Sequence, residues 1–194
     1  MSMSKNILFS GVGGQGILLA SELTAATLLR AGYDVKKSEV HGMAQRGGSV
    51  TAQLRYGERV YSPLIDPGTA DIQMAFEMME AVRYLSYLNQ NSTVIVNIQK
   101  ILPPSVATGQ AAYPKDVLEE LRKRKIRVIG VDAFSIAKDA GEVRTANVAL
   151  VGALSVHLDV DSKIFESVIE NRVPERFLKE NMKAFAAGRA AGGR

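Results

Sequence analysis

The stretch NILFSGVGGQGILLA, residues 6–20, decides the fold that we expect for this chain. A short apolar run leads into a glycine-rich loop, and the loop leads into an apolar run with helical periodicity. Glycines allow a tight turn and bring backbone N–H groups close to an anion at the positive end of the following helix. The stretch therefore predicts a β-loop-α unit, with a strand over residues 7–12 and a helix over residues 17–31. It also raises the question of whether the loop holds the phosphates of a nucleotide.

Strands and helices alternate along the rest of the chain. Further strands are predicted over residues 35–40, 50–56, 59–64, 71–76 and 93–99 and within IRVIGVDAF at residues 126–134. Residues 50–56 and 59–64 flank Gly57-Glu58, which is typical of a hairpin. Helices are predicted over residues 77–88, 117–124, 146–158 and 162–171 and after Pro174.

This alternation predicts an α/β fold, because parallel strands are joined by helical crossovers that cover both faces of the sheet. We expect a three-layer α/β/α, Rossmann-like domain with an open, mostly parallel but mixed sheet and a C-terminal helical segment. The 194 residues, 46% of them hydrophobic and 23% charged, suit one domain over residues 1–194. We expect the small-residue tail AAGRAAGGR, residues 186–194, to be frayed.

Composition excludes several classes of site and partner. The chain has no cysteine, so it can form no disulfide and supply no thiolate for zinc or an iron–sulfur cluster. No apolar run approaches the roughly 20 residues that span a bilayer, so we expect a cytoplasmic protein without a membrane partner. The densest basic run, RKRKIR at residues 122–127, has no aromatic residue within it. We interpret it as a solvated helix end rather than a nucleic-acid site.

The first candidate site is the glycine loop, which satisfies the G-x-G-x-x-G pattern of dinucleotide-binding proteins. That pattern also needs an acidic residue at the end of the second strand to bind the ribose. Asp34 precedes the second predicted strand and Glu39 lies 28 residues after Gly11, so the fit is incomplete and classical NAD(P) binding is the less favoured interpretation. The loop either packs a crowded turn or presents itself to a ligand or a subunit held elsewhere. Its candidate residues are Gly11, Gly13, Gly14, Gln15 and Gly16.

The second candidate site is a polar loop within SEVHGMAQRGGSV, residues 38–50. It lies between two predicted strands, at the sheet edge where open α/β folds form their ligand crevice. Arg46 has the chemistry to bind a carboxylate or phosphate, and His41 the chemistry to move protons near neutral pH. Alternatively, Arg46 pairs with a carboxylate of this subunit or across an interface, and His41 caps the loop. The candidate residues are His41, Gln45, Arg46, Gly47, Gly48 and Ser49.

The chain lacks a self-sufficient set of catalytic residues. It has no serine in a G-x-S-x-G turn and no cluster of His, Asp and Glu at metal-ligand spacing. The only other histidine, His157, lies late in an apolar helix and is interpreted as structural. We therefore assign neither a catalytic residue nor a metal ligand to this chain.

Six motifs, in order along almost the whole chain, carry a resemblance to a known family. They are GVGGQGILLAS at 11–21, SEVHGMAQRGGSV at 38–50, YSPLI at 61–65, AFE at 75–77, VIVN at 94–97 and VPERFLKENMKAFAAG at 173–188. In this set the chain resembles the gamma-module family of the 2-oxoacid:ferredoxin oxidoreductases. The MAQRGG form of the second loop is similar to the small (beta) subunits of the indolepyruvate branch.

The resemblance implies a role in a multi-subunit enzyme. Such an enzyme oxidatively decarboxylates an aryl 2-oxoacid such as indolepyruvate, passes electrons to ferredoxin and transfers the acyl group to coenzyme A. Thiamine diphosphate, Mg²⁺ and [4Fe–4S] clusters are then carried by a large (alpha) partner subunit, and this chain alone binds none of them and is not active alone. Two alternatives stay open: the gamma subunit of a pyruvate or 2-oxoglutarate ferredoxin oxidoreductase, and a stand-alone Rossmann-type nucleotide-binding protein.

Overall fold

The computed structural model describes residues 4–41 and 48–193 of the chain. Within these residues, six strands form one sheet in the order β2-β3-β1-β4-β5-β6. In chain order the strands are β1 (Lys5–Val12), β2 (Asp34–His41), β3 (Ser49–Gly57), β4 (Ile72–Ala75), β5 (Thr93–Asn97) and β6 (Arg127–Val131).

The sheet is mixed, as the sequence predicts. Strands β1, β4, β5 and β6 are parallel neighbours, whereas β3 runs antiparallel to β1 on one side and to β2 on the other. In the β1–β3 pair Val12, the last residue of β1, lies opposite Ser49, the first residue of β3. The loop that follows β1 and the residue that precedes β3, Gly48, therefore meet at the same edge of the sheet, where the Gly13 N–H donates to the Gly48 carbonyl.

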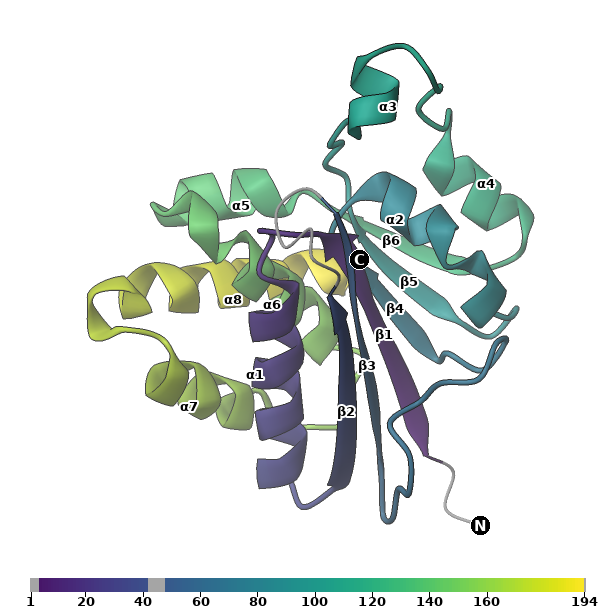
Figure 1. Ribbon diagram of the computed structural model, residues 1–194. Coiled ribbons are helices and arrows are strands. Elements are labelled where there is room, and N and C mark those ends of the chain that lie inside the picture. Colours follow the sequence, from purple (N-terminus) through teal and green to yellow (C-terminus); the bar gives the residue numbers. More distant parts are fainter. Residues whose placement is uncertain (1–3, 42–47, 194) are drawn as a thin grey trace.

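Helices cover both faces of the sheet and complete three layers (Figure 1). One face carries α1 (Ile17–Arg30), α5 (Ala133–Ala140), α6 (Ala146–Ser155), α7 (Ser162–Arg172) and α8 (Leu178–Gly192). The other carries α2 (Met78–Arg83) and α4 (Val117–Lys123), with α3 (Pro104–Ala107) standing above them in Figure 1. Short 3-10 turns lie at η1 (Leu85–Tyr87), η2 (Val143–Thr145) and η3 (Glu175–Phe177).

The central strand β1 is apolar on both faces, which is why the helices can pack on either side of it. Ile7 and Phe9 face the α1 side and belong to the larger core, and Leu8 belongs to the smaller core under α2 and α4. Strand side chains alternate between faces, so an uninterrupted apolar run indicates a strand covered on both sides. The three-layer α/β/α fold class predicted from the sequence is confirmed.

The predicted hairpin around Gly57-Glu58 is wrong. Residues 58–71, all described, contain no strand, and β3 pairs with β1 and β2 instead. Side chains of the sheet satisfy the backbone of this segment. Arg55 donates to the carbonyl oxygens of Ser62 and Leu64, and Gln53 Oε1 accepts from the Ile65 N–H at 2.7 Å. With these partners, and with Pro63 unable to donate, no ladder forms.

Three helical regions also differ from the prediction. The helix expected over residues 77–88 ends at Arg83 and is followed by η1. Part of the DAF sequence assigned to the last strand begins α5, a helix that the sequence reasoning missed, with the Asp132 carboxylate accepting from the Ser135 N–H at its start. The tail expected to fray is helical as far as Gly192. No helix in the described residues is long and apolar enough to cross a membrane.

Candidate functional site

The candidate site lies where the parallel strands end. The glycine loop follows β1, Phe76 and Glu77 follow β4, and Gln99 follows β5. A cavity of about 430 Å³ opens between these turns and the starts of α5 and α6, and Gly14, Gln15 and Gly16 line it. This placement agrees with the general position of ligand crevices in open α/β sheets.

The glycines of the loop have steric reasons for being glycine. Gly16 precedes α1 with φ +78°, and a Cβ there would lie 2.5 Å from Asn147 Nδ2. A Cβ on Gly11 would lie 2.7 Å from the Cβ of Phe76. Gly14 has φ +102°, with open space around it. The turn therefore needs these glycines whether or not it holds a ligand.

Most of the backbone donors of the loop are already occupied. The Val12 N–H donates to Gln15 Oε1 at 2.8 Å, the Gly13 N–H to the Gly48 carbonyl at 2.8 Å and the Gln15 N–H to the Val12 carbonyl at 3.2 Å. A loop that cradles a pyrophosphate must leave such groups free to point at the anion. Within the loop, the N–H groups of Gly14 and Gly16 are the ones without a partner among the described residues.

Gln15 fastens the glycine loop to the neighbouring strands. Its Nε2 donates to the Phe76 carbonyl at 2.8 Å and to Gln99 Oε1 at 3.3 Å. Asn97 Nδ2 donates to the same two acceptors, and Asn97 Oδ1 accepts from the Ala133 N–H. Three amide side chains thus tie the ends of β1, β4 and β5 together beneath the cavity. Sequence reasoning identified Gln15 but missed Asn97 and Gln99, because their convergence depends on strand order.

The second predicted loop meets the first one through its last two residues. Gly48 accepts the bond from Gly13, and Ser49 Oγ donates to Glu80 Oε2 at 2.6 Å and lies 3.0 Å from the Tyr84 hydroxyl. His41 is the last residue of β2, and the predicted site residues Gln45, Arg46 and Gly47 lie outside the described residues. The backbone bond therefore brings together the two predicted loops as far as they are described.

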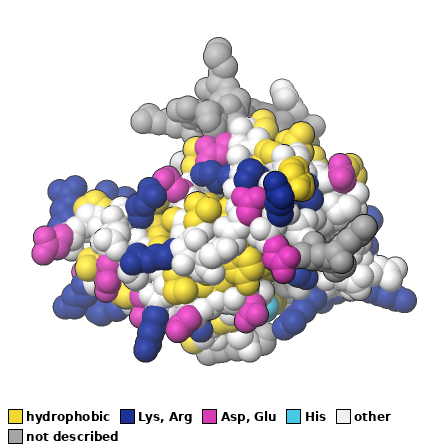
Figure 2. All heavy atoms as spheres, turned by 90° about the horizontal axis from the view of Figure 1, so that it is seen from below, with side chains coloured by type: hydrophobic (Ala, Val, Ile, Leu, Met, Phe, Trp, Pro, Cys, Tyr) yellow, Lys and Arg dark blue, Asp and Glu magenta, His cyan; other side chains and the backbone are white. Residues whose placement is uncertain are grey.

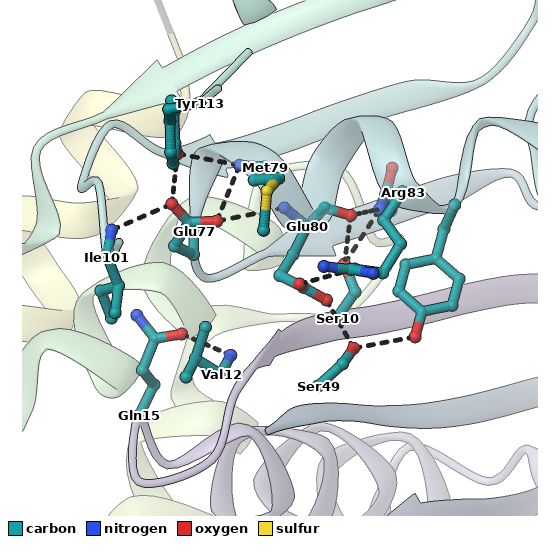
Figure 3. A network of polar contacts seen from close by, with 12 residues as sticks. Ser10, Val12, Gln15, Ser49, Glu77, Met79, Glu80, Arg83, Ile101 and Tyr113 are labelled. Carbon is teal, nitrogen blue, oxygen red and sulfur yellow. Dashed lines mark hydrogen bonds and ion pairs between the residues drawn. The ribbon is translucent and has the colours of Figure 1, made fainter. Parts of the chain in front are cut away.

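Two buried carboxylates, Glu77 at the N-cap of α2 and Glu80 within the helix, anchor the segments around the site (Figure 3). Glu80, 2% exposed, binds Ser49 on one side and Arg83 Nε at 2.8 Å on the other. Glu77, fully buried, accepts from the N–H groups of Met79, Glu80 and Ile101 and from the Tyr113 hydroxyl. Burial, followed by the bond to Glu77, raises the pKa of Tyr113.

Glu77 is a structural residue that sequence reasoning did not place in the site. Its carboxylate binds both Ile101 and Tyr113, and so joins the two ends of the segment between β5 and α4 that carries α3. The available signal was the polar residue of AFE directly after a buried strand, since that position lies at the carboxyl edge of the sheet.

Beside the cavity, Arg144 is held in a fixed orientation. Its guanidinium donates to both carboxylate oxygens of Glu142, at 3.0 and 2.7 Å, and lies over the ring of Phe177 at 4.8 Å. Hydrogen bonding to Arg144 lowers the pKa of Glu142 to about 2. The two charges compensate each other, so this pair adds little net charge to the cavity.

The structure does not provide the rest of a dinucleotide site. In that kind of site the strand next to β1 is parallel and ends in the acidic residue that binds the ribose. Here antiparallel β3 separates β1 from β2. Asp34 binds Lys36 and the Val60 N–H, and Glu39 is paired with Lys37 at 2.6 Å. Neither carboxylate is placed beside the glycine loop.

No metal site stands out among the described residues, and charges of the basic run are paired within its helix. In the described residues no group of three or more His, Cys, Asp or Glu side chains is arranged to hold a metal ion. In the basic run, Lys123 pairs with Glu119 and Arg124 with Glu120 along α4. Figure 2 shows basic side chains interspersed with acidic ones on the face that it presents. The two ion pairs along α4 favour a solvated surface for the basic run.

Comparison with known proteins decides the family. The family model described as pyruvate ferredoxin/flavodoxin oxidoreductase matches residues 6–191. The chain belongs to this family. It is 44% identical over 190 residues to indolepyruvate oxidoreductase subunit IorB of Archaeoglobus fulgidus, with 96% of this chain and 94% of that one covered. The corresponding IorB subunit of Thermococcus kodakarensis is 42% identical over 94% of this chain and 93% of its own length.

More distant relatives are named for other oxoacids or for oxoacids in general. The 2-oxoglutarate synthase subunit KorC of Methanothermobacter marburgensis is 29% identical, with 96% of each chain covered. The gamma subunit of a keto/oxoacid ferredoxin oxidoreductase from Geobacter sulfurreducens has a solved structure that superposes with a TM-score of 0.72. It is 24% identical over 97% of this chain and 98% of that one, which shows a shared fold. The resemblance stated from the motifs is confirmed.

Proposed function

We propose that this chain is the small subunit of an indolepyruvate:ferredoxin oxidoreductase. The observation that carries the proposal is the contrast between relatives of equal coverage. Identity to four indolepyruvate oxidoreductase subunits is 35% to 44% over almost the whole of each chain, and identity to the 2-oxoglutarate subunit is 29%. The proposed reaction converts an aryl 2-oxoacid, coenzyme A and oxidised ferredoxin into acyl-CoA, CO₂ and reduced ferredoxin.

The redox cofactors are assigned to a large partner subunit. Iron–sulfur clusters need cysteine thiolates, and this chain has no cysteine, so its residues do not fit such a cluster. Thiamine diphosphate with Mg²⁺ would supply the carbanion chemistry of decarboxylation from the partner.

The contribution proposed for this chain is to position its two loops against the partner and to cover the partner's reacting centre. The two loops at the carboxyl edge, residues 11–16 and 41–49, are proposed to face the cofactor region of the partner. The carboxylates of Glu77 and Glu80 and the amide of Gln15 hold the described parts of this edge in one arrangement. A rigid protein surface over a reacting centre excludes water and protons, which protects a carbanion intermediate.

Co-expression with the large subunit tests the proposal. A tagged version of this chain should copurify with a brown, cysteine-rich partner, and the pair should reduce ferredoxin with indolepyruvate and coenzyme A. A panel of indolepyruvate, pyruvate and 2-oxoglutarate should give a kcat/KM at least tenfold higher for the aryl substrate. Preference for pyruvate or 2-oxoglutarate would replace the indolepyruvate assignment by the corresponding gamma subunit.

Arg46 is the residue of the second loop chosen for a functional test. Arg46→Ala in the reconstituted pair should lower turnover of the oxoacid or of coenzyme A, because a guanidinium binds carboxylate and phosphate groups, and it should leave subunit association intact. Arg59→Ala, which removes an arginine from the segment after β3, is the matched control and should leave the kinetics unchanged. Equal kinetics for both variants would remove Arg46 from the site.

A further inference from the structure

The cavity at the carboxyl edge has a chemistry that the proposed function does not use. Among the described residues that line it there is no Asp or Glu, and polar groups come from glycine backbone, amide side chains and Arg144. The charge of Arg144 is balanced by Glu142. The remaining electrostatic influence is the positive end of α1, which corresponds to roughly half an elementary charge. The cavity is therefore suited to a group with a single negative charge.

The first turn of α1 leaves its donors unpaired. Gly16 precedes the helix without a capping side chain, and the first turn contains no acidic residue. Within the described part of the chain, the N–H groups of Gly14, Gly16 and Ile17 have no hydrogen-bond partner. Gly14 and Gly16 line the cavity. Helix N-termini with free N–H groups bind anions, but this feature alone does not identify a site.

Asn147 gives the second, independent observation. Its side chain is 6% exposed, lines the cavity and lies against Gly16. Asn147 Oδ1 accepts from the Val148 N–H at 2.9 Å, whereas no residue of the described chain accepts a hydrogen bond from Asn147 Nδ2. Nδ2 is not one of the fully buried side-chain atoms that lack a partner in the described residues, so it stays accessible from the cavity and can donate to a group held there. An acceptor atom of a ligand in the cavity would pair both with Asn147 and with the start of α1.

Part of the cavity lining is apolar and in part aromatic. Phe134 at the start of α5 and Val143 in η2 are 49% and 48% exposed, and Phe76 and Leu150 complete this part of the lining. Exposed large apolar side chains around a concave site are typical of sites for apolar ligands. The volume of about 430 Å³ has room for a two-ring aromatic molecule.

We propose that this cavity binds a small aromatic carboxylate. The carboxylate would accept from Asn147 Nδ2 and from the N–H groups at the start of α1, and the ring would lie against Phe134 and Val143. A carboxylate carries one charge, in agreement with the balanced Arg144–Glu142 pair, whereas a phosphate carries up to two. The ligand class follows from the cavity and does not depend on the proposed function. If both hold, the small subunit supplies a site for acids of the substrate class at the edge that is proposed to face the cofactor region of its partner.

Binding to the purified full chain tests this site. Titration calorimetry with indole-3-acetate should give a one-to-one complex with a dissociation constant below about 1 mM, and indole, acetate and inorganic phosphate should each bind at least tenfold more weakly. Equal binding of indole would show that the carboxylate is not recognised. Tighter binding of phosphate would overturn the assignment to a carboxylate.

Two variants locate the binding. Asn147→Asp keeps the acceptor for the Val148 N–H but replaces the free donor by a negative charge, so affinity for indole-3-acetate should fall at least tenfold. Asn171→Asp, with the same change in charge on the exposed surface of α7, should bind like the original chain. Phe134→Ala should also weaken binding, and because Phe134 is half exposed this variant should retain its melting temperature. Unchanged affinity in both Asn147→Asp and Phe134→Ala overturns the proposal, whatever the oxoacid panel shows.

Discussion

At the scale of single residues, the glycine motif shows how one pattern serves two purposes. Gly11 and Gly16 are required because Phe76 and Asn147 occupy the space that a side chain would need. The same turn occurs in dinucleotide-binding proteins for the sake of the pyrophosphate. The motif therefore identifies the strand-turn-helix geometry but not the ligand. The position of the acidic residues and the strand order distinguish a dinucleotide site from a turn that needs its glycines for packing.

Replacement of Gly16 by alanine should destabilise the protein more than replacement of Gly14. Both positions have positive φ, which costs about 1–2 kcal/mol for an L-residue, and at Gly16 the new methyl group also collides with Asn147. We expect a decrease in unfolding free energy of about 3 kcal/mol for Gly16→Ala and about 1 kcal/mol for Gly14→Ala. Urea denaturation of the two variants measures both; equal losses would contradict the packing role of Asn147.

Loss of the Glu77 carboxylate should loosen the segment between β5 and α4, which carries α3. In Glu77→Gln one acceptor oxygen becomes an NH₂ group that faces donors, and we expect a loss of about 2–3 kcal/mol in unfolding free energy. Tyr113→Phe removes one partner only and should cost about 1 kcal/mol. Hydrogen exchange should report faster exchange of the Ile101 amide in Glu77→Gln. Unchanged exchange there would show that Glu77 does not hold this segment.

His157 should make stability depend on pH. Burial lowers its pKa below the ordinary 6.5, although the bond that Nε2–H donates to the Gly192 carbonyl acts in the opposite direction. The unfolded chain therefore binds more protons near pH 6, and the unfolding free energy should decrease as the pH falls below 6.5. His157→Gln should reduce this slope in denaturation curves measured between pH 5 and pH 8. A variant with the original slope would exclude His157 as its source.

At the scale of elements, the C-terminal helix is fixed by close backbone contact. A Cβ on Gly188 would lie 1.9 Å from the Ala149 carbonyl oxygen, and one on Gly192 would lie 2.5 Å from that of Ala153. Small residues let α8 approach α6 at this distance. The sequence reasoning took the same small residues as a sign of fraying, because composition does not reveal which surface they contact.

Gly188→Ala should therefore prevent the docking of α8. We expect a loss of about 3 kcal/mol or more, since the contact is with backbone, which cannot move aside as a flexible side chain can. Gly193→Ala is the matched control, because its nearest neighbour lies at an ordinary contact distance of 3.7 Å. Thermal unfolding followed by circular dichroism compares the two. Equal melting temperatures would contradict the close packing of α6 and α8.

Periodicity predicted the elements that have a regular pattern of buried residues. It failed where contacts between distant parts of the chain determine the local structure. The apolar runs of β1 and β5 and the helical spacing in α1 and α7 are local signals, and these elements lie where the sequence predicts them. The hairpin predicted after β3 does not form, because the side chains of Arg55 and Gln53 bind the backbone of the following segment. Local periodicity does not reveal these contacts. The amide network of Gln15, Asn97 and Gln99 was equally invisible, because strand order brings these residues together.

At the scale of the whole molecule, strand order separates this protein from the dehydrogenases that share its glycine motif. Antiparallel β3 occupies the place beside β1 where a dinucleotide fold has a parallel strand. The edge thus formed gathers the glycine loop, the described end of the second loop, a cavity and two buried carboxylates. With family membership and no cysteine in the chain, this arrangement leads to the proposal of a subunit that assists a cofactor-bearing partner.

The most direct test of that proposal is indolepyruvate-dependent reduction of ferredoxin, measured for this chain, for the large subunit and for the reconstituted pair under the same conditions. The account predicts that this chain alone shows no turnover and that adding it to the large subunit raises the rate at least a hundredfold. Turnover by this chain alone, or a large subunit that is equally active without it, would contradict the account.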